Sequence, residues 1–251
     1  MGARFTRKTR RIVRWAVTAS AALALGVGGM VVANSASADP SADANPEGID
    51  VSHYQGAINW SSVKSAGIEF AWIKATEGTS VIDDKFGANY GGAYDAKVIR
   101  GAYHFASSFG NGAAQANYFA AHGGAWSADG LTLPGALDLE ASCSGVSQST
   151  VRTFISDFYD AYKAKTGRDV VLYTTASWWS TCTGNWTGMG SKSPLWVAHW
   201  GASSPSIPSG FPAWTAWQFS DKGSVSGISG AVDRDHFNGS RDRLVALADN
   251  K

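Results

Sequence analysis

The sequence predicts an α/β fold, an irregular β/α barrel with fewer helices than strands. Short apolar runs alternate with amphipathic stretches, an order typical of parallel strands joined by crossover helices. Eight such runs are present, which is the number that closes a β/α barrel. In the last third of the chain the connections 201–213 and 220–230 are rich in Gly, Ser and Pro and too short for crossover helices. We therefore expect the last strands to connect by loops and to pair antiparallel.

Each expected strand is a short apolar run bounded by turn residues. In chain order the strands are Gly48–His53, Phe70–Thr76, Ile99–Phe105, Gly135–Glu140, Val170–Thr175, Leu195–Trp200, Ala213–Phe219 and Ala231–Phe237.

The clearest expected helix is Ser147–Thr166, in which apolar residues recur at helical spacing and which Gly167 follows as a C-cap. No internal repeat or second domain is evident, so residues 47–251 are expected to form one barrel domain. The other expected helices are Ser61–Ala66, Asp84–Lys97, Ala113–His122 and a closing helix Ser240–Ala248.

The first 38 residues predict a cleaved signal peptide. Residues 1–16 contain six basic residues and no acidic one. A weakly apolar stretch follows and ends with Ala36, Ser37 and Ala38, the small residues of a cleavage site. A short Pro- and Asp-containing linker, 39–46, follows. We expect secretion by the Sec or the Tat route, and no stable membrane association after cleavage.

Removing the leader leaves 15 basic against 20 acidic residues, a net charge of about −5. A mildly acidic chain without a basic, aromatic stretch excludes nucleic acid as an expected partner. The two cysteines, Cys143 and Cys182, lie in the exported part and in no nucleophile motif, so we expect a disulfide. No metal-ligand spacing of Cys or His is present, and no metal or cofactor is expected.

The most informative segment is LPGALDLE, residues 133–140. Asp138 and Glu140 are two apart on an expected strand, so both side chains project from one face at a spacing of about 6.6 Å. Two close carboxylates raise the pKa of one of them. A carboxylic acid that stays protonated near neutral pH is what cleavage of a glycosidic bond requires. A solvent-facing acidic pair at a strand end is the plainer alternative.

Polar side chains gather at or near the carboxyl ends of many of the expected strands. In β/α barrels this end carries the active site, which favours the functional interpretation of the acidic pair. The residues are Asp50, His53, Lys74, Glu77, His104, Asp138, Glu140, His199, Trp200, Gln218, Asp233 and Asp235.

Four segments taken together resemble the glycoside hydrolase family 25 lysozymes, the Chalaropsis-type muramidases. They are GIDVSHYQG (48–56), GAYHF (101–105), LDLE (137–140), and WQFS (217–220) with GISGAVD (227–233). The resemblance covers about residues 46–249, and the cysteine pair is similar to the bridge of Streptomyces-type members. It implies a modified TIM-type β/α barrel that hydrolyses the β-1,4 bond between N-acetylmuramic acid and N-acetylglucosamine in peptidoglycan.

Carried over residue by residue, the resemblance implies that Glu140 is the general acid/base and that Asp138 orients the acetamido group of the substrate. Asp50 and Asp233 match two further acidic residues of the family. Whether Asp233 or Asp235 faces the groove stays open, because the local sequence VDRDHF has two acids. The residues expected to bind the sugars are Tyr103, Tyr173, Trp200, Trp217, Gln218 and Asp235.

Two other functions remain as alternatives. A chitinase or endo-N-acetylglucosaminidase also uses an Asp-x-Glu strand, but commonly carries a further Asp where this chain has Ala136. A non-catalytic wall-binding module would be expected to have lost Glu140 or Asp50. The expected partner is the peptidoglycan glycan strand, bound by a monomer.

Overall fold

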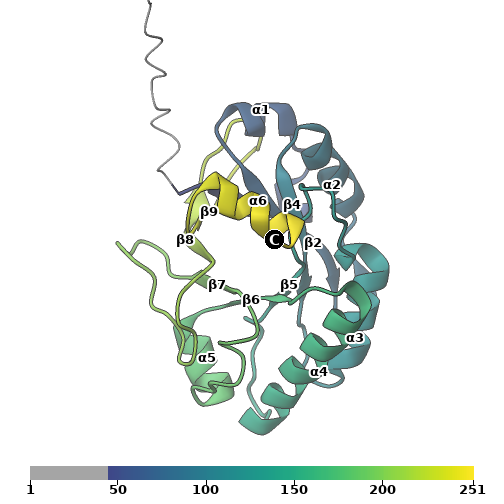
Figure 1. Cartoon of the computed structure of the whole chain (residues 1–251), viewed down its shortest axis with the longest axis vertical. Coiled ribbons are helices and arrows are strands. Elements are labelled where there is room, and N and C mark those ends of the chain that lie inside the picture. The colour runs from purple at the N-terminus through teal and green to yellow at the C-terminus, as the bar shows by residue number, and fades with distance from the viewer. Residues whose placement is uncertain (1–44) are drawn as a thin grey trace, which may run out of the picture. The chain divides into compact units, whose positions relative to one another are not determined.

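The computed structural model describes residues 45–251 (Figure 1). The predicted signal peptide, 1–38, lies outside the described residues, as does the predicted linker except for Asn45 and Pro46. No helix among residues 45–251 has the length and apolar character needed to cross a membrane.

Eight strands close into a barrel. A ninth strand, of two residues, pairs antiparallel with the last residues of β2. The barrel strands from β1 to β8 pair parallel, whereas the last one, β9, pairs antiparallel with both β8 and β1 and so closes the ring. The strands are β1 (Glu47–Val51), β2 (Phe70–Glu77), β3 (Val81–Ile82), β4 (Ile99–Phe105), β5 (Ala136–Asp138), β6 (Val171–Thr174), β7 (Leu195–Ala198), β8 (Ala216–Gly223) and β9 (Val232–Phe237).

The predicted fold class is confirmed, with six α-helices and nine strands in the described part of the chain. Antiparallel pairing of the last strand is also confirmed, but β7 and β8 pair parallel although no helix joins them. The helices are α1 (Trp60–Ser65), α2 (Phe86–Asp95), α3 (Gly112–Phe119), α4 (Gln148–Thr166), α5 (Ala176–Thr183) and α6 (Arg241–Asp249). Two irregular turns, η1 (His53–Gln55) and η2 (Ala120–Gly124), follow β1 and α3.

Local sequence signals fix the ends of the longer helices. The Ser147 hydroxyl accepts a hydrogen bond from the Thr150 amide and begins α4, and Gly167, with φ of 73°, ends it in the left-handed conformation as predicted. Thr175 and Gly184 cap α5 in the same way. The sequence analysis predicted neither α5 nor β3, and the structure shows both.

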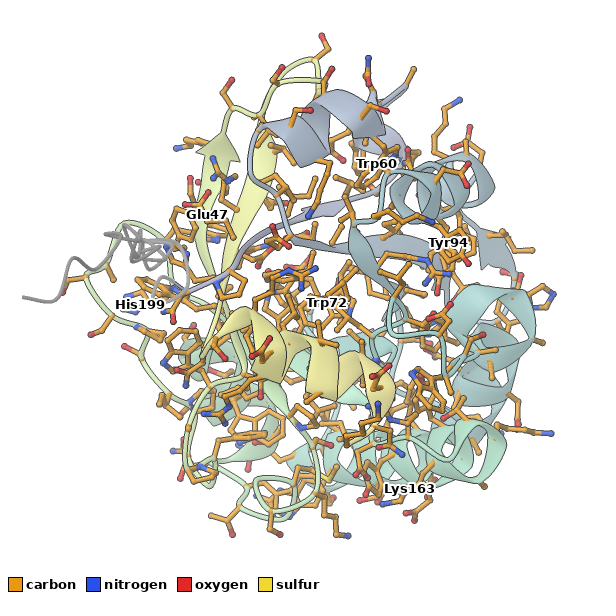
Figure 2. All side chains as sticks on the ribbon, turned by 45° about the horizontal axis from the view of Figure 1, so that its top comes forward. Glu47, Trp60, Trp72, Tyr94, Lys163 and His199 are labelled. Atoms are coloured by element: carbon orange, nitrogen blue, oxygen red, sulfur yellow. A yellow bond between two sulfur atoms is a disulfide. The ribbon has the colours of Figure 1, made fainter. Side chains whose placement is uncertain are left out.

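Alternate residues of each strand face the barrel interior or the surrounding helices. On β2, Trp72 packs inside the barrel, whereas Ile73 and Ala75 pack outward against the helical layer. The Trp72 ring stacks on Trp196 of β7, with 4.6 Å between ring centroids. Gly101 on β4 leaves room for this pair, because a Cβ there would lie 2.7 Å from Trp72 Nε1. The barrel interior is therefore filled, with Trp72 at its centre (Figure 2).

Helix α6 closes one end of the barrel. Leu244 and Ala248 pack into the interior cluster beside Phe70 and Phe237, which lie at the amino end of β2 and the carboxyl end of the antiparallel β9. In Figure 1 the helix lies across the ring of strands. The opposite end, where the parallel strands finish, stays open and holds the polar residues.

Candidate active site

The open end of the barrel contains a cleft with a volume of about 570 Å³, large enough for sugar rings. Six acidic side chains and one lysine line it, together with aromatic rings and Gln218. The acidic lining comes from β1, β2, β8, β9, and from β5 and the segment after it: Asp50, Glu77, Asp138, Glu140, Asp221 and Asp233. A concave site of this charge does not suit an anionic ligand such as a phosphate.

Asp138 and Glu140 both line the cleft, although β5 ends at Asp138. The alternation of the strand continues past its end, because Leu137 and Leu139 both pack in the outer core. Asp138 is 6% exposed and its Oδ1 has no hydrogen-bond partner, while Glu140 is exposed at the mouth.

Burial and the neighbouring Glu140 raise the pKa of Asp138 well above its ordinary value. Burial and the charge of Asp233 raise the pKa of Glu140, against the opposing effect of Lys74. The two carboxyls of the pair therefore titrate as one unit that retains a proton at higher pH than an isolated carboxyl.

A second acidic group lies across the barrel, on β1 and β9. Asp50 is directly opposite Asp233 in the antiparallel register, and both line the cleft. Asp235 is fully buried behind them, where its Oδ1 accepts a hydrogen bond of 2.7 Å from Trp196 Nε1. Because β9 runs opposite to the other strands, its earlier residue lies nearer the rim. Asp233 therefore faces the groove, and the structure does not bring Asp235 to its surface.

Gln218 connects the two walls of the cleft. Its Oε1 accepts hydrogen bonds from the Tyr173 hydroxyl (2.9 Å) and from Trp200 Nε1 (2.8 Å). The amide nitrogen must then face the other way, and it donates to Asp50 Oδ2 at 2.8 Å. The side chain thus holds two aromatic residues and one carboxylate in fixed relative positions.

The predicted aromatic residues divide into two groups. Tyr103, Tyr173 and Trp200 line the cleft, and Trp200 remains 51% exposed at its rim. Trp217 does not line it, because it is adjacent to Gln218 on β8 and so faces the opposite side of the strand. Its ring is in the outer core, and Nε1 donates to the His199 carbonyl at 2.9 Å. Strand alternation predicts from the sequence that these two neighbours face opposite sides of β8, but not which of them faces the cleft.

Several residues of the cleft were not among the predicted site residues. Lys74 Nζ forms an ion pair with Glu77 Oε2 at 2.9 Å on the wall beside Asp138. Lys74 lies near the end of the predicted strand Phe70–Thr76 and Glu77 follows that strand directly. Both were already among the polar residues expected at the carboxyl ends of strands, and this was the available signal. Tyr54, 81% exposed in η1, extends the rim, and its place in the segment GIDVSHYQG is the signal that could have found it.

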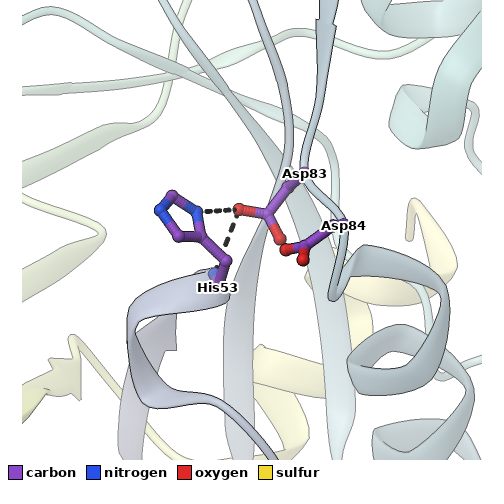
Figure 3. Close-up of side chains that lie close together, drawn as sticks. All are labelled: His53, Asp83 and Asp84. Atoms are coloured by element: carbon purple, nitrogen blue, oxygen red, sulfur yellow. Dashed lines mark hydrogen bonds and ion pairs between the residues drawn. The ribbon is translucent and has the colours of Figure 1, made fainter.

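Among the described residues, one group has ligand atoms close enough for a metal ion: His53, Asp83 and Asp84, within 4.8 Å of one another (Figure 3). Asp83 Oδ2 accepts a hydrogen bond from the backbone amide of His53 at 3.0 Å. The same oxygen lies 2.7 Å from Nδ1 of the His53 ring, also within hydrogen-bonding distance. The arrangement ties the turn after β1 to the segment before α2, and so supports the rim that carries Tyr54.

A family model for "Glycosyl hydrolases family 25" matches residues 49–228. The chain belongs to glycosyl hydrolase family 25. The resemblance inferred from the motifs is therefore confirmed, and the matched region contains the cleft residues of every barrel strand except β9.

Named relatives of this family 25 chain agree. "Lysozyme M1" of Streptomyces globisporus is 62% identical over 217 residues, which cover 84% of this chain and 74% of the relative. An "N,O-diacetylmuramidase" of Chalaropsis is 46% identical over 212 residues, covering 80% and 98% of the two chains. The crystal structure of a bacterial lysozyme from Streptomyces coelicolor is 62% identical with a TM-score of 0.80, covering 82% and 98%.

The family 25 domain also contains the predicted disulfide. Cys143 and Cys182 are bonded and span 39 positions of sequence. Cys143 follows Glu140 by three residues and Cys182 is in α5, so the bridge fastens the segment after the acidic pair to that helix. Trp178 of α5 adds a hydrogen bond of 2.7 Å to the Ala141 carbonyl.

Proposed function

We propose that this family 25 chain is a secreted lysozyme, hydrolysing the β-1,4 bond from N-acetylmuramic acid to N-acetylglucosamine in peptidoglycan. The observation that carries the proposal is the position of Asp138 and Glu140, both in one sugar-sized acidic cleft at the carboxyl end of the barrel. The names of the lysozyme and muramidase relatives support the same substrate. Export by the predicted leader of residues 1–38 would bring the enzyme to cell walls.

Glu140 is the proposed general acid. Its raised pKa lets it donate a proton to the glycosidic oxygen as the bond from the anomeric carbon breaks. Its exposure at the mouth, where Asp138 is buried, suits a group that must reach the leaving oxygen.

Asp138 is the proposed partner of the 2-acetamido group. The acetamido N–H would donate to the Asp138 carboxylate while the acetamido oxygen attacks the anomeric carbon. In the empty cleft the pair holds a proton in common, and the N–H donor favours ionised Asp138, which moves that proton to Glu140. Ionised Asp138 then stabilises the positive charge that develops on the cyclic intermediate.

Glu140 next acts as a base. It takes a proton from the water that opens the intermediate, so the product keeps the β configuration. Asp50 and Asp233 contribute negative charge opposite the pair, and Tyr103, Tyr173, Trp200 and Gln218 are the proposed sugar contacts.

The decisive variant is Glu140→Gln, which keeps the shape and loses the proton. We expect turnover of purified cell walls to fall by about 100-fold or more, as for loss of a general acid, while wall binding is retained. Mass spectrometry of the fragments that the native protein releases from cell walls should show reducing muramic acid ends. The native protein should release no fragments from chitin. Equal lysis by the variant would refute the assignment of Glu140 and favour a different site.

A further inference from the structure

We propose that Asp235 is a positioning residue that stays protonated in the active protein, and that its Oδ2–H donates a hydrogen bond to the Asp50 carboxylate. Asp50 is thereby held as an anion in the cleft wall. The effect on turnover rests on the proposed lysozyme function, whereas the protonation of Asp235 does not.

The first argument is the burial of Asp235. The side chain is 0% exposed, and only one of its two oxygens is satisfied, by Trp196 Nε1 at 2.7 Å. Oδ2 is buried, and no hydrogen-bond donor reaches it. A buried carboxylate oxygen without a donor is costly, and a proton on that oxygen removes both the charge and the unsatisfied acceptor.

The second argument is the location of an acceptor within reach. The Asp50 and Asp235 carboxyls lie at hydrogen-bonding distance across the β1–β9 pair. Asp50 Oδ2 already accepts the Gln218 amide, whose orientation is fixed by Tyr173 and Trp200. Burial and the charge of Asp235 raise the pKa of Asp50 as well, and the hydrogen bond from Gln218 lowers it. Asp50 thus has a donor for its charged form and access to the cleft, whereas the free oxygen of Asp235 has neither solvent nor a donor.

Burial outweighs the neighbouring groups in setting the protonation of Asp235. The charge of Asp233, on the same strand, raises the pKa of Asp235. The hydrogen bonds with Trp196 and Asp50 and the charge of Arg234 lower it. Arg234 is adjacent on β9, so it points to the other side of the strand, where it pairs with Glu47. Trp196 of β7 and Gln218 of β8 present neutral groups. Burial as the main cause raises the pKa of Asp235 to about 7.

The consequence is a specific dependence on pH. Above pH 7 Asp235 would ionise, lose its hydrogen bond to Asp50 and add a second charge behind the cleft wall. Asparagine has the shape of aspartic acid and a permanent N–H donor, so Asp235→Asn should reproduce the protonated state at every pH. Leucine matches the size without a donor.

The test combines a titration with kinetics. In the native protein labelled with ¹³C at the aspartate carboxyls, NMR should show a buried carboxyl that titrates near pH 7 and is missing in Asp235→Asn. On purified cell walls, the ratio of the rate at pH 8 to the rate at pH 6 should be about tenfold higher for Asp235→Asn than for the native protein, since one unit above the pKa leaves about a tenth of the acid protonated. Asp235→Leu should be slower than Asp235→Asn at both pH values.

Three results would overturn the proposal. One is a native spectrum in which every aspartate carboxyl is ionised below pH 6. Another is an Asp235→Asn variant with an unchanged rate ratio. The third is an active Asp50→Asn protein beside an inactive, folded Asp235→Asn protein, which would place the proton on Asp50. If the native protein does not cleave cell walls at all, the lysozyme function fails, and the NMR titration still decides the protonation of Asp235.

Discussion

Removing the disulfide tests how much the covalent loop stabilises the barrel. In the double variant Cys143→Ser, Cys182→Ala the loop of 39 positions is no longer closed in the unfolded chain. For a loop of that length the chain-entropy relation gives a loss of about 4 kcal/mol in the free energy of unfolding. Alanine is chosen at Cys182 because that side chain is 4% exposed, and a hydroxyl there would add its own cost.

The assay is guanidinium unfolding followed by tryptophan fluorescence, together with thermal unfolding. A loss of about 4 kcal/mol corresponds to a melting temperature lower by about 8–16 °C for a domain of this size. Reducing agent is the matched control, because it should bring the native protein close to the variant and leave the variant unchanged. A loss below about 1 kcal/mol would refute the reasoning and show that the unfolded chain is already restricted without the bond.

Two further perturbations address the acidic cleft. Gln218→Glu replaces the amide that donates to Asp50 with a fourth carboxyl near Asp50, Asp233 and Asp235. We expect turnover of cell walls to fall by about 10–100-fold, because a charge-assisted hydrogen bond is lost. A folded variant with native turnover at pH 6 would contradict this. Burial raises the pKa of Asp235 to about 7 and of Asp233 to about 6, from 3.8 for an exposed Asp, so the folded state binds more protons than the unfolded chain between these limits. Their contribution to stability is therefore full below about pH 4 and is lost as the pH rises through 6 to 7, and the melting temperature should fall over that range, less steeply in Asp235→Asn; equal slopes would count against the assignment.

Much of the fold could be predicted because strand periodicity and capping signals are local. The range of β4 is the predicted one, Ile99–Phe105, and the other barrel strands differ from the prediction at their ends. Helix α5 was missed because its sequence, ASWWSTCT, has few strong helix formers, although Thr175 and Gly184 are ordinary caps. Strand β3 has two residues, too few for any periodic signal.

The location of the site could be predicted wherever the sequence shows the carboxyl end of a strand. Asp138, Glu140 and Asp50 lie in one cleft because parallel strands finish at the same end of the barrel. The antiparallel direction of β9 was expected, but the depth of Asp235 depends on the register of β9 against β1, which the sequence does not show. The position of Trp217 depends on which face of β8 is inner, and that is settled only by its neighbours in the barrel.

The closing of the barrel by α6 has a practical consequence for attachment. The helix that carries the last residues packs on the end of the barrel away from the cleft, and Pro46 is held at the same end by the Phe237 amide. Both tethering points of the described domain therefore emerge at the end of the barrel away from the cleft. A surface, a tag or an added module joined at either point would leave the path of a long glycan through the groove unobstructed.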